Sequence, residues 1–483
     1  MMRADSTINA DILLVTAHYD RYERGGRLAS IGADLPSLSL LYLASYLREF
    51  GVKVGICDAS ALRYSLPDLL KVISEFNCRV LGISATTPSI SRAGRLAQQV
   101  KSYFPDKIIV AGGPHATATG EETLKKIPWL DCLVIGEGEQ TLLELLAKLD
   151  DKNTWKDIPG LVYRDNDTFR RTTPRELVKD IDDIPAPAWD LLDGFPERYH
   201  PAYFKTRLQP AAHIVTSRGC PFQCIFCDTS VFSRSVRYNS VEYVMDMLEI
   251  LTKRFGIREV SFEDDTFTLN LKRAEAICRE MIERRLNISW TCNARVQTMP
   301  PELLELFRET GCWQMAFGIE SGCQEILDFS RKGTRLENIQ LAIRQTRKVG
   351  IRTRGFFILG FPNETEKTLR RTLDFAKSLA LDDISLSYMT PFPGSQMHRI
   401  AHQYGSLDDD WSKMTILEAV FVPHGLSEDI LKKWYDRFII AFYFRPKIIL
   451  SHLLEALRNP RVGIQLLTSS IRLVFTMFRG LTR

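Results

Sequence analysis

Strand-like and amphipathic helix-like segments alternate along two long stretches of this chain, residues 10–135 and 210–400. A strand–helix unit repeated in this way predicts a parallel sheet, because a helix is the usual crossover between parallel strands. A chain of 483 residues is also too long for a single hydrophobic core. The pattern therefore predicts an α/β protein with two separate parallel sheets, one in each half.

The second stretch predicts six strand–helix units, a partial (β/α)₆ barrel within residues 208–405. Catalytic groups on such a sheet belong at the carboxyl ends of the strands, and polar clusters occur at these ends. The expected strands are 211–219, 258–269, 288–295, 313–322, 351–365 and 383–395, and the expected helices are 240–255, 271–286, 300–311, 336–350 and 365–380.

The first stretch predicts a doubly wound, Rossmann-like sheet within residues 1–150. No GxGxxG follows its first strand, so a dinucleotide site is a poor interpretation. Small residues stand instead at the ends of the third and fourth strands, where they would let a bulky ligand approach the backbone: Ser84, Thr86, Gly112 and Gly113. The expected strands are 10–19, 52–60, 79–89, 107–117 and 131–139, and the expected helices are 36–50, 65–77, 91–104 and 120–130.

Three cysteines lie within eight positions after the first strand of the second stretch: Cys220, Cys224 and Cys227. A disulfide would leave one thiol over, and a structural zinc site needs a fourth ligand from a second pair that the sequence lacks. Three thiolates on one loop suit a cubane iron–sulfur cluster with one iron open. The other seven cysteines are scattered singly, as expected of reduced core thiols.

The pattern CxxxCx(aromatic)C, with Phe226 as the aromatic residue, resembles the radical S-adenosylmethionine (SAM) superfamily. The resemblance implies a [4Fe–4S] cluster on the three cysteines, SAM on its open iron and an external electron donor such as flavodoxin or ferredoxin. Gly360 and Glu364 resemble the family's adenine-contact segment, with slightly different spacing. The SAM contacts it implies at strand ends are Glu263, Asp264, Asp265, Asn293, Arg295, Glu320, Ser321, Gly360 and Glu364.

The first domain resembles the cobalamin-binding domain that precedes many radical SAM domains. Its DxHxxG motif reads "DASALR" here: Asp58 is kept, and Ser60 stands where the family's histidine would bind cobalt. Ser84 and the pair Gly112–Gly113 match the rest of that pattern, and a Rossmann-like domain without cofactor is the alternative. His115 could be a ligand, but it is interpreted as a helix-capping or surface residue.

Both resemblances together cover nearly the whole chain. With both domains, the chain resembles a group that contains cobalamin-dependent radical SAM methylases and the anaerobic magnesium-protoporphyrin ester cyclase. These resemblances imply methylation of an unactivated carbon of a tetrapyrrole or isoprenoid-type substrate. Radical ring formation on the same cofactors and a cobalamin-dependent sensor stay open as alternatives. The net charge of +4 gives no basis for a nucleic-acid partner.

Residues 151–207 predict a hairpin and a proline-rich linker, and residues 406–483 a helical tail. The N-terminus shows no secretory signal and no segment is apolar enough to span a membrane, so a cytoplasmic protein is expected. Residues 445–483 carry seven Lys/Arg and one acidic residue among apolar groups. This pattern indicates contact with a membrane surface or with a hydrophobic, acidic substrate, or else helices packed on the barrel. The aromatic residues expected to line a substrate site are Phe392, Trp411, Phe421, Trp434, Tyr435, Phe438 and Phe442.

Overall fold

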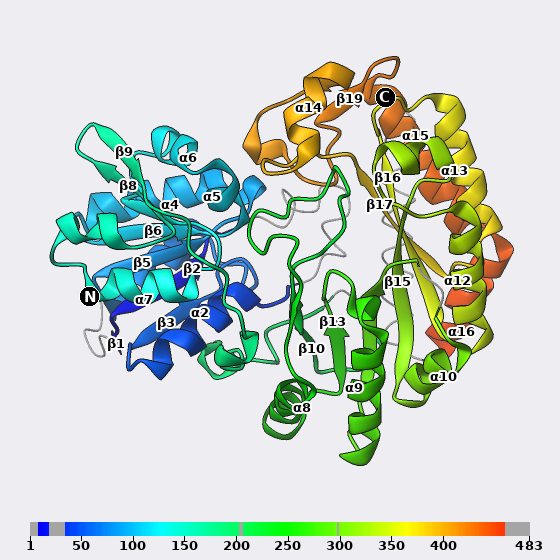
Figure 1. Cartoon of the computed structure of the whole chain (residues 1–483), viewed down its shortest axis with the longest axis horizontal. Coiled ribbons are helices and arrows are strands. Elements are labelled where there is room, and N and C mark those ends of the chain that lie inside the picture. The colour runs from blue at the N-terminus through cyan, green and yellow to red at the C-terminus, as the bar shows by residue number, and fades with distance from the viewer. Residues whose placement is uncertain (1–7, 19–33, 202–205, 297–298, 459–483) are drawn as a thin grey trace.

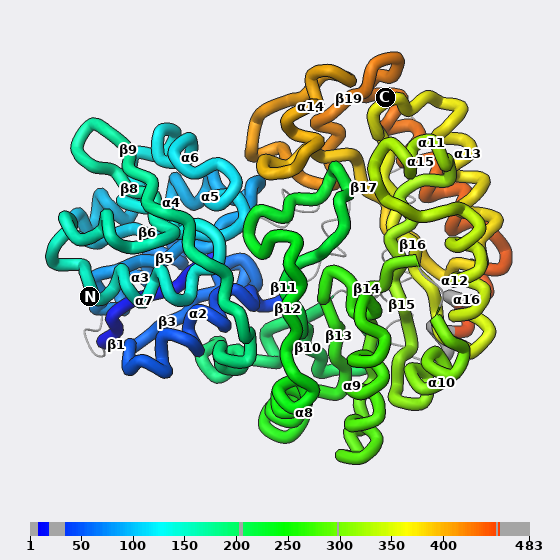
Figure 2. Tube along the Cα trace, in the orientation of Figure 1, coloured from blue at the N-terminus to red at the C-terminus, as the bar shows by residue number. Residues whose placement is uncertain are grey.

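Two parallel sheets in two neighbouring units form the described part of the chain (Figures 1 and 2). The computed structural model describes residues 8–18, 34–201, 206–296 and 299–458. Of these residues, no helix is long and apolar enough to cross a bilayer. The two predicted sheets are confirmed.

The first sheet has five parallel strands in the order β3-β2-β5-β6-β7. The order reverses between β2 and β5, and ligands of doubly wound sheets bind beyond the carboxyl ends of the strands at such a point. Its strands are β2 (Ile12–Thr16), β3 (Val54–Cys57), β5 (Val80–Ser84), β6 (Ile108–Gly112) and β7 (Cys132–Val134). Its helices are α2 (Leu38–Glu49), α3 (Leu66–Glu75), α4 (Ile90–Tyr103), α5 (Pro114–Thr119), α6 (Glu121–Lys126) and α7 (Glu139–Ala147).

The predicted hairpin extends this first sheet. Strand β8 (Leu161–Asp165) pairs antiparallel with β7 and with β9 (Thr168–Arg171). A parallel pair at β1 (Ile8–Asn9) and β4 (Phe76–Asn77) lies apart from it. The linker that follows contains the short 3₁₀ turns Ile181–Asp183 and Trp189–Leu191.

The second sheet is a curled row of six parallel strands in chain order, as expected of a partial barrel. Its strands are β10 (Ala211–Ile214), β13 (Glu259–Phe262), β14 (Ser289–Ala294), β15 (Cys312–Glu320), β16 (Arg352–Leu359) and β17 (Asp383–Tyr388). Its helices are α8 (Val241–Glu249) with the π-turn Ile250–Arg254, α9 (Leu271–Glu283), α10 (Pro301–Glu309), α11 (Gln324–Phe329), α12 (Leu336–Lys348) and α13 (Glu366–Ser378). A short ladder of β11 (Ser217–Arg218) and β12 (Arg237–Tyr238) flanks the cysteine loop.

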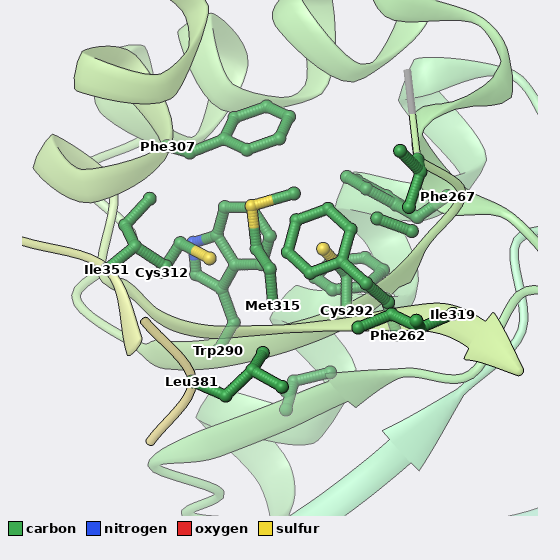
Figure 3. Packing of buried hydrophobic residues seen from close by; sticks show 14 of the residues in the cluster. Phe262, Phe267, Trp290, Cys292, Phe307, Cys312, Met315, Ile319, Ile351 and Leu381 are labelled. Carbon is green, nitrogen blue, oxygen red and sulfur yellow. The ribbon is translucent and has the colours of Figure 1, made fainter. Parts of the chain in front are cut away.

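The largest core lies between this second sheet and its helices (Figure 3). Phe262, Phe267 and Phe307 pack around the indole of Trp290 with ring centroids 5.3–5.8 Å apart. Trp290 Nε1 donates to Thr310 O, so its one polar atom is satisfied inside the core. This packing fixes the strands whose carboxyl ends carry the candidate site.

The C-terminal region returns to the first unit before it forms helices. After α14 (Gln396–Tyr404), strands β18 (Gly405–Leu407) and β19 (Phe421–Pro423) pair, and the 3₁₀ turn Trp411–Lys413 lies between them. Helix α15 (Glu428–Tyr443) then packs on α13, and α16 (Pro446–Arg458) follows. The predicted tail beyond residue 458 lies outside the described residues.

Four helices, α5, α7, α11 and α14, escaped the sequence analysis, and each has nine residues or fewer. Residues 114–117, expected at the end of a strand, begin α5, because Gly113 has φ +104° and turns the chain. Helix α7 begins at Glu139, the last residue of another expected strand. Helix α11 has only six residues.

The seven aromatic residues expected at a substrate site are packed in hydrophobic clusters instead. Phe421, Phe438 and Phe442 are fully buried, and Trp434 donates from Nε1 to Glu366. Tyr435 stacks on Tyr388, while Phe392 and Trp411 pack against the first domain. The rings on α15 therefore form the packing of this helix on α13 and the edge strand β17, while contact of Phe392 and Trp411 with a substrate stays a prediction.

Candidate functional site

The loop that carries Cys220, Cys224 and Cys227 is held from three sides. Ile225 N donates to Ser330 O (3.1 Å), and Ile225 O accepts from Met397 N (2.7 Å). At its start, Gly219 has φ +93°, and a Cβ there would lie 2.3 Å from Ser235 O. Only glycine fits that position, so the backbone fixes where the first thiol begins.

Two cations lie near one of the three thiols, that of Cys224. A hydrogen bond from Cys227, together with the positive charges of Lys332 and Arg295, lowers the pKa of Cys224 to about 6, while burial acts against this. Arg295 Nη1 lies 4.0 Å from Cys224 Sγ. The described residues contain no group of three His, Cys, Asp or Glu side chains around a single metal ion. A cubane takes one thiolate per iron, and thiolates beside cations fit such a negatively charged cluster.

Polar side chains from neighbouring strands meet at the same edge. Glu263, after β13, accepts from Ser261 Oγ (2.8 Å) and from Asn293 Nδ2 at the end of β14 (3.1 Å). Arg295 stacks on the Phe222 ring at 3.5 Å, which directs its guanidinium toward the cysteine loop. Asp265 is exposed at this edge. Glu263, Asp265, Asn293 and Arg295 thus lie where a ligand of the cysteine loop could reach them.

Two of the expected contacts are used inside the fold. Asp264 is completely buried, and its Oδ1 accepts from Thr216 N, Thr216 Oγ1 and Ser217 Oγ, so it caps the end of β10. Ser321 is also completely buried and shares a hydrogen bond with Thr372 Oγ1. Both side chains stabilise the loops that carry the site, and their contact with SAM stays a prediction.

Glu320 forms a buried ion pair with Lys332 (2.7 Å), a residue that the sequence analysis did not select. Glu320 has φ +66°, and the strand register shifts between Gly318 and Glu320. A Cβ at Gly318 would lie 2.5 Å from Lys332 Nζ, so the glycine makes room for the ammonium group. Lys332 lies in a loop between α11 and α12, where nothing in the local pattern distinguishes it from a surface lysine.

The turn after β16 is shaped by Glu364. Its Oε2 accepts from Gly360 N (2.5 Å) and Phe361 N (3.1 Å), and burial raises its pKa to about 8. Gly360 has φ +89°, which favours glycine. Phe361 meets Phe226 of the cysteine loop edge to face, with ring centroids 5.8 Å apart. The carboxyl group thus holds this turn against the cysteine loop.

In the first domain, Asp58 is buried just after the carboxyl end of β3, and both of its carboxylate oxygens accept hydrogen bonds. Its Oδ1 accepts from Thr16 Oγ1 (2.8 Å) and its Oδ2 from Ser37 N (2.6 Å). Ser60 N donates to Thr16 Oγ1 (3.0 Å). These bonds order the loop around Ser60, and the motif contains no imidazole for Asp58 to orient.

A row of hydroxyl groups lies at the point where the strand order reverses. Ser39 Oγ lies 3.0 Å from Ser37 Oγ and 3.2 Å from Ser84 Oγ, at the end of β5. Ser37 and Ser39 were not predicted, because a serine before or in the first turn of a helix reads as a helix cap. The row offers hydrogen bonds to a polar ligand at this edge.

The small residues of the fourth strand differ in their roles. A Cβ at Gly113 would lie 2.7 Å from Ala85 O, so this glycine allows the backbone of β6 to approach its neighbour. A Cβ at Gly112 would lie 3.7 Å from Val134 O, which is ordinary van der Waals contact, so close packing does not demand a glycine here. Thr86 is exposed and begins a 3₁₀ turn.

His115 does not lie at the surface, contrary to expectation. It is fully buried, its Nδ1 lies 3.2 Å from Thr87 Oγ1, and burial lowers its pKa to about 4. Its ring packs on Trp411 with centroids 4.4 Å apart. The segment that carries Trp411 returns over the first domain and covers His115. The sequence gives no sign of this contact, because the two residues are far apart along the chain.

Family models match both halves of the chain: the radical SAM superfamily over residues 214–376 and the B12-binding domain over residues 25–146. An uncharacterized methyltransferase of Pyrococcus horikoshii is 37% identical over 428 residues, covering 88% of this chain and 91% of that protein. The chain belongs to the B12-binding radical SAM methyltransferase family. Both resemblances expected from the cysteine loop and the "DASALR" segment are confirmed for this radical SAM enzyme.

Other relatives of this radical SAM enzyme differ in their named reactions. The anaerobic magnesium-protoporphyrin IX monomethyl ester cyclase of Rubrivivax gelatinosus is 32% identical, covering 78% of this chain and 68% of that protein. The cobalamin-dependent SAM radical enzyme OxsB, solved with aqua-cobalamin and SAM, superposes with a TM-score of 0.73 at 19% identity, covering 96% of this chain and 72% of that one. The methyltransferase TsrM from Kitasatospora setae, solved with cobalamin and a [4Fe–4S] cluster, gives a TM-score of 0.65 at 20% identity, covering 82% and 78%.

Proposed function

We propose that this enzyme methylates an unactivated carbon atom of a hydrophobic small molecule, of tetrapyrrole or isoprenoid type. The observation that carries the proposal is the pairing of two sites in one chain. One is the three-thiol loop at the carboxyl edge of the second sheet, and the other is the carboxyl edge of the first sheet, which carries Asp58, Ser84 and Gly112 and is called the cobalamin-type edge below. An unactivated carbon has no lone pair for ordinary methyl transfer. Two cofactors with separate tasks, aligned by one protein, fit that demand.

The residues available for each cofactor follow from the geometry. Cys220, Cys224 and Cys227 would hold a [4Fe–4S] cluster, and the edge formed by Glu263, Asn293 and Arg295 would hold SAM beside Phe226, with the Gly360 turn opposite. The hydroxyl row and the backbone at Gly112 would hold cobalamin. When bound, these groups supply an organic radical and a transferable methyl group.

Ser60 in place of the family's histidine leads us to expect no protein imidazole on cobalt. The Co(II) form of the bound cobalamin should therefore show no hyperfine splitting from a protein nitrogen in its electron paramagnetic resonance spectrum. A spectrum with that splitting would contradict this assignment.

The substrate class rests on the named relatives, which include a hopanoid C-3 methylase at 26% identity and a bacteriochlorophyllide methyltransferase at 26% identity. The test is anaerobic turnover of a hopanoid, a bacteriochlorophyllide and a magnesium-protoporphyrin ester with mass analysis of the products. Methylation adds one CH₂ unit to the product mass. Products without this gain from all three compounds would count against methylation of these classes.

Ring formation is the second candidate, and the 32% identity with the cyclase of Rubrivivax gelatinosus favours it over other reactions. It would change the mass of the magnesium-protoporphyrin ester without adding a methyl group, so the same assay separates the two. A cobalamin-dependent sensor would leave SAM intact under reducing conditions.

Two partners complete the proposal: an electron donor such as flavodoxin or ferredoxin, and an anionic membrane surface. Exposed apolar side chains after α15 and on α16, including Phe444, Leu450 and Leu454, support the membrane contact, as does the basic sequence 445–483. Flotation with phosphatidylglycerol vesicles should recover the protein, and a Leu450→Ser/Leu454→Ser variant should lose this binding. Ile282→Ser, at an exposed site on α9, is the matched control.

A further inference from the structure

Four charged side chains form a buried network where the two domains meet. Arg218 Nη1 donates to Glu137 Oε1 (2.8 Å), and Arg218 Nη2 donates to Glu139 Oε1 (2.7 Å). Arg237 Nη1 donates to Glu137 Oε2 (2.8 Å). Each of the four side chains is at most 10% exposed. The network contains two positive and two negative charges and is neutral as a whole.

The two halves of the network come from the carboxyl edges of the two sheets. Glu137 follows β7 of the first sheet, and Glu139 is the first residue of α7. Arg218 ends β11, two residues before Cys220, and faces Arg237 across the β11–β12 ladder. The ion pairs therefore join the cobalamin-type edge directly to the start of the cysteine loop.

Further contacts hold the same junction. Tyr42, on α2 of the first domain, donates from its hydroxyl to Val215 O (3.1 Å) just after β10, and the Arg218 guanidinium lies 5.4 Å from its ring. Val178 N, in the linker, donates to Glu137 Oε2 (2.9 Å). The two arginines lower the pKa of Glu137 even though burial acts to raise it, so the carboxylate form is favoured here.

A buried network of this kind contributes more to geometry than to net stability. The cost of taking charges out of water offsets much of their attraction, but removing one partner leaves another charge buried and unpaired. The fork of Arg218 also binds two different carboxylates, which fixes direction as well as distance. A rigid, directional junction next to Cys220 is what alignment of two cofactor sites requires.

We propose that Glu137 and Glu139 are positioning residues that act through Arg218 and set the distance between the cysteine loop and the cobalamin-type edge. The proposal rests on the proposed function, because methyl transfer needs both sites aligned on one carbon, whereas SAM cleavage needs only the cysteine-loop site. A misplacement of about 1 Å can lower a rate about 10²-fold. Loss of the network should therefore uncouple SAM cleavage from methyl transfer.

The test compares Glu139→Leu with Glu139→Gln in the full chain loaded with cluster and cobalamin. Pulsed electron paramagnetic resonance between Co(II) and the reduced cluster measures their distance distribution. We expect a broader distribution in Glu139→Leu, with a ratio of methylated product to 5′-deoxyadenosine that falls about 10²-fold. Glu139→Gln keeps an acceptor for Arg218 and should fall between this variant and the wild type.

The control is Glu144→Leu on the same helix, since Glu144 pairs with Arg175 of the linker rather than with the barrel. It should leave the distance distribution unchanged. Hydrogen exchange of the cofactor-free chain gives a second readout, because the amides of residues 217–218 and 237–238 should exchange faster in Glu139→Leu only. An unchanged distribution and unchanged exchange in Glu139→Leu would overturn the proposal, whereas a product without added mass would overturn methylation alone.

Discussion

At the scale of single residues, the three loop cysteines support the sharpest expectation. Anaerobically reconstituted protein should bind about four irons, and Cys220→Ala, Cys224→Ala and Cys227→Ala should each lose the cluster and SAM cleavage. Iron analysis and the yield of 5′-deoxyadenosine measure this. Cys57→Ala and Cys278→Ala are controls, because both thiols are buried away from the loop. SAM cleavage retained in all three loop variants would rule out the assigned site.

Glu364 predicts a dependence of stability on pH. Burial raises its pKa from 4.5 to about 8, so the folded protein keeps a proton that the unfolded chain has lost in this interval. The free energy of unfolding therefore falls as the pH rises through this interval, by about 1.4 kcal/mol per pH unit for a single group. Glu364→Gln should lose less stability than the wild type between these limits.

Urea denaturation at both ends of the interval measures the difference. The control is Glu305→Gln, at an exposed position of α10, which should follow the wild type. Parallel behaviour of Glu364→Gln and the wild type would show that Glu364 does not titrate as its burial suggests.

The sequence predicted which strand ends carry the site but not which side chains face it. Glu263 and Asp264 are adjacent acidic residues, yet side chains alternate along a strand. Glu263 points to the same side as Ser261 and bonds to it, whereas Asp264 is buried and caps β10. Lys332 was missed because it lies in a loop, and its importance comes from contact with Glu320 at the end of β15.

At the scale of elements, α15 protects the edge of the curled sheet. Tyr435 and Tyr443 donate to Leu386 O and Ile384 O of β17, so the helix occupies an edge that would otherwise be open to another chain. Its amphipathic pattern was visible in the sequence, but its partner was not. An apolar stripe on a helix could contact either a substrate or the barrel, and the sequence pattern is the same in both cases. Only the observed packing distinguishes these two roles.

A pair of substitutions on α15 tests this packing. Phe438 is fully buried and meets Phe357 of β16 with ring centroids 5.4 Å apart. Phe438→Ala should lower the free energy of unfolding by about 3–5 kcal/mol, the usual cost of such a cavity. Ile440→Ala, two residues along the same helix and 38% exposed, should cost far less. Equal denaturation midpoints for the two variants would show that α15 is not part of the core.

At the scale of the whole molecule, the two parallel sheets follow from the alternation read in the sequence, but the contacts between domains do not. The segment between β18 and β19 crosses to the first domain and places Trp411 on His115, with Lys126 Nζ 3.7 Å from its ring. These residues are separated by nearly three hundred positions. Local patterns carry no information about such a contact.

Removal of this contact should loosen one segment and leave the cysteine loop unchanged. Trp411→Ala is expected to speed hydrogen exchange of residues 405–423 and 87–90, because the indole fills a cluster shared by both. Iron content should stay at the wild-type level. Trp129→Ala, at a position 40% exposed, is the control. Slow exchange in both segments of Trp411→Ala would show that the crossing is held by other contacts.

The burial of the Glu137–Arg218 network predicts how the protein responds to salt. Dissolved ions screen charges that water reaches, over about 8 Å at physiological ionic strength, but they do not enter a buried pair. Exposed pairs such as Lys126–Glu122 should weaken in concentrated salt. The junction between the domains should not, so the enzyme can be purified in high salt with its two halves still aligned.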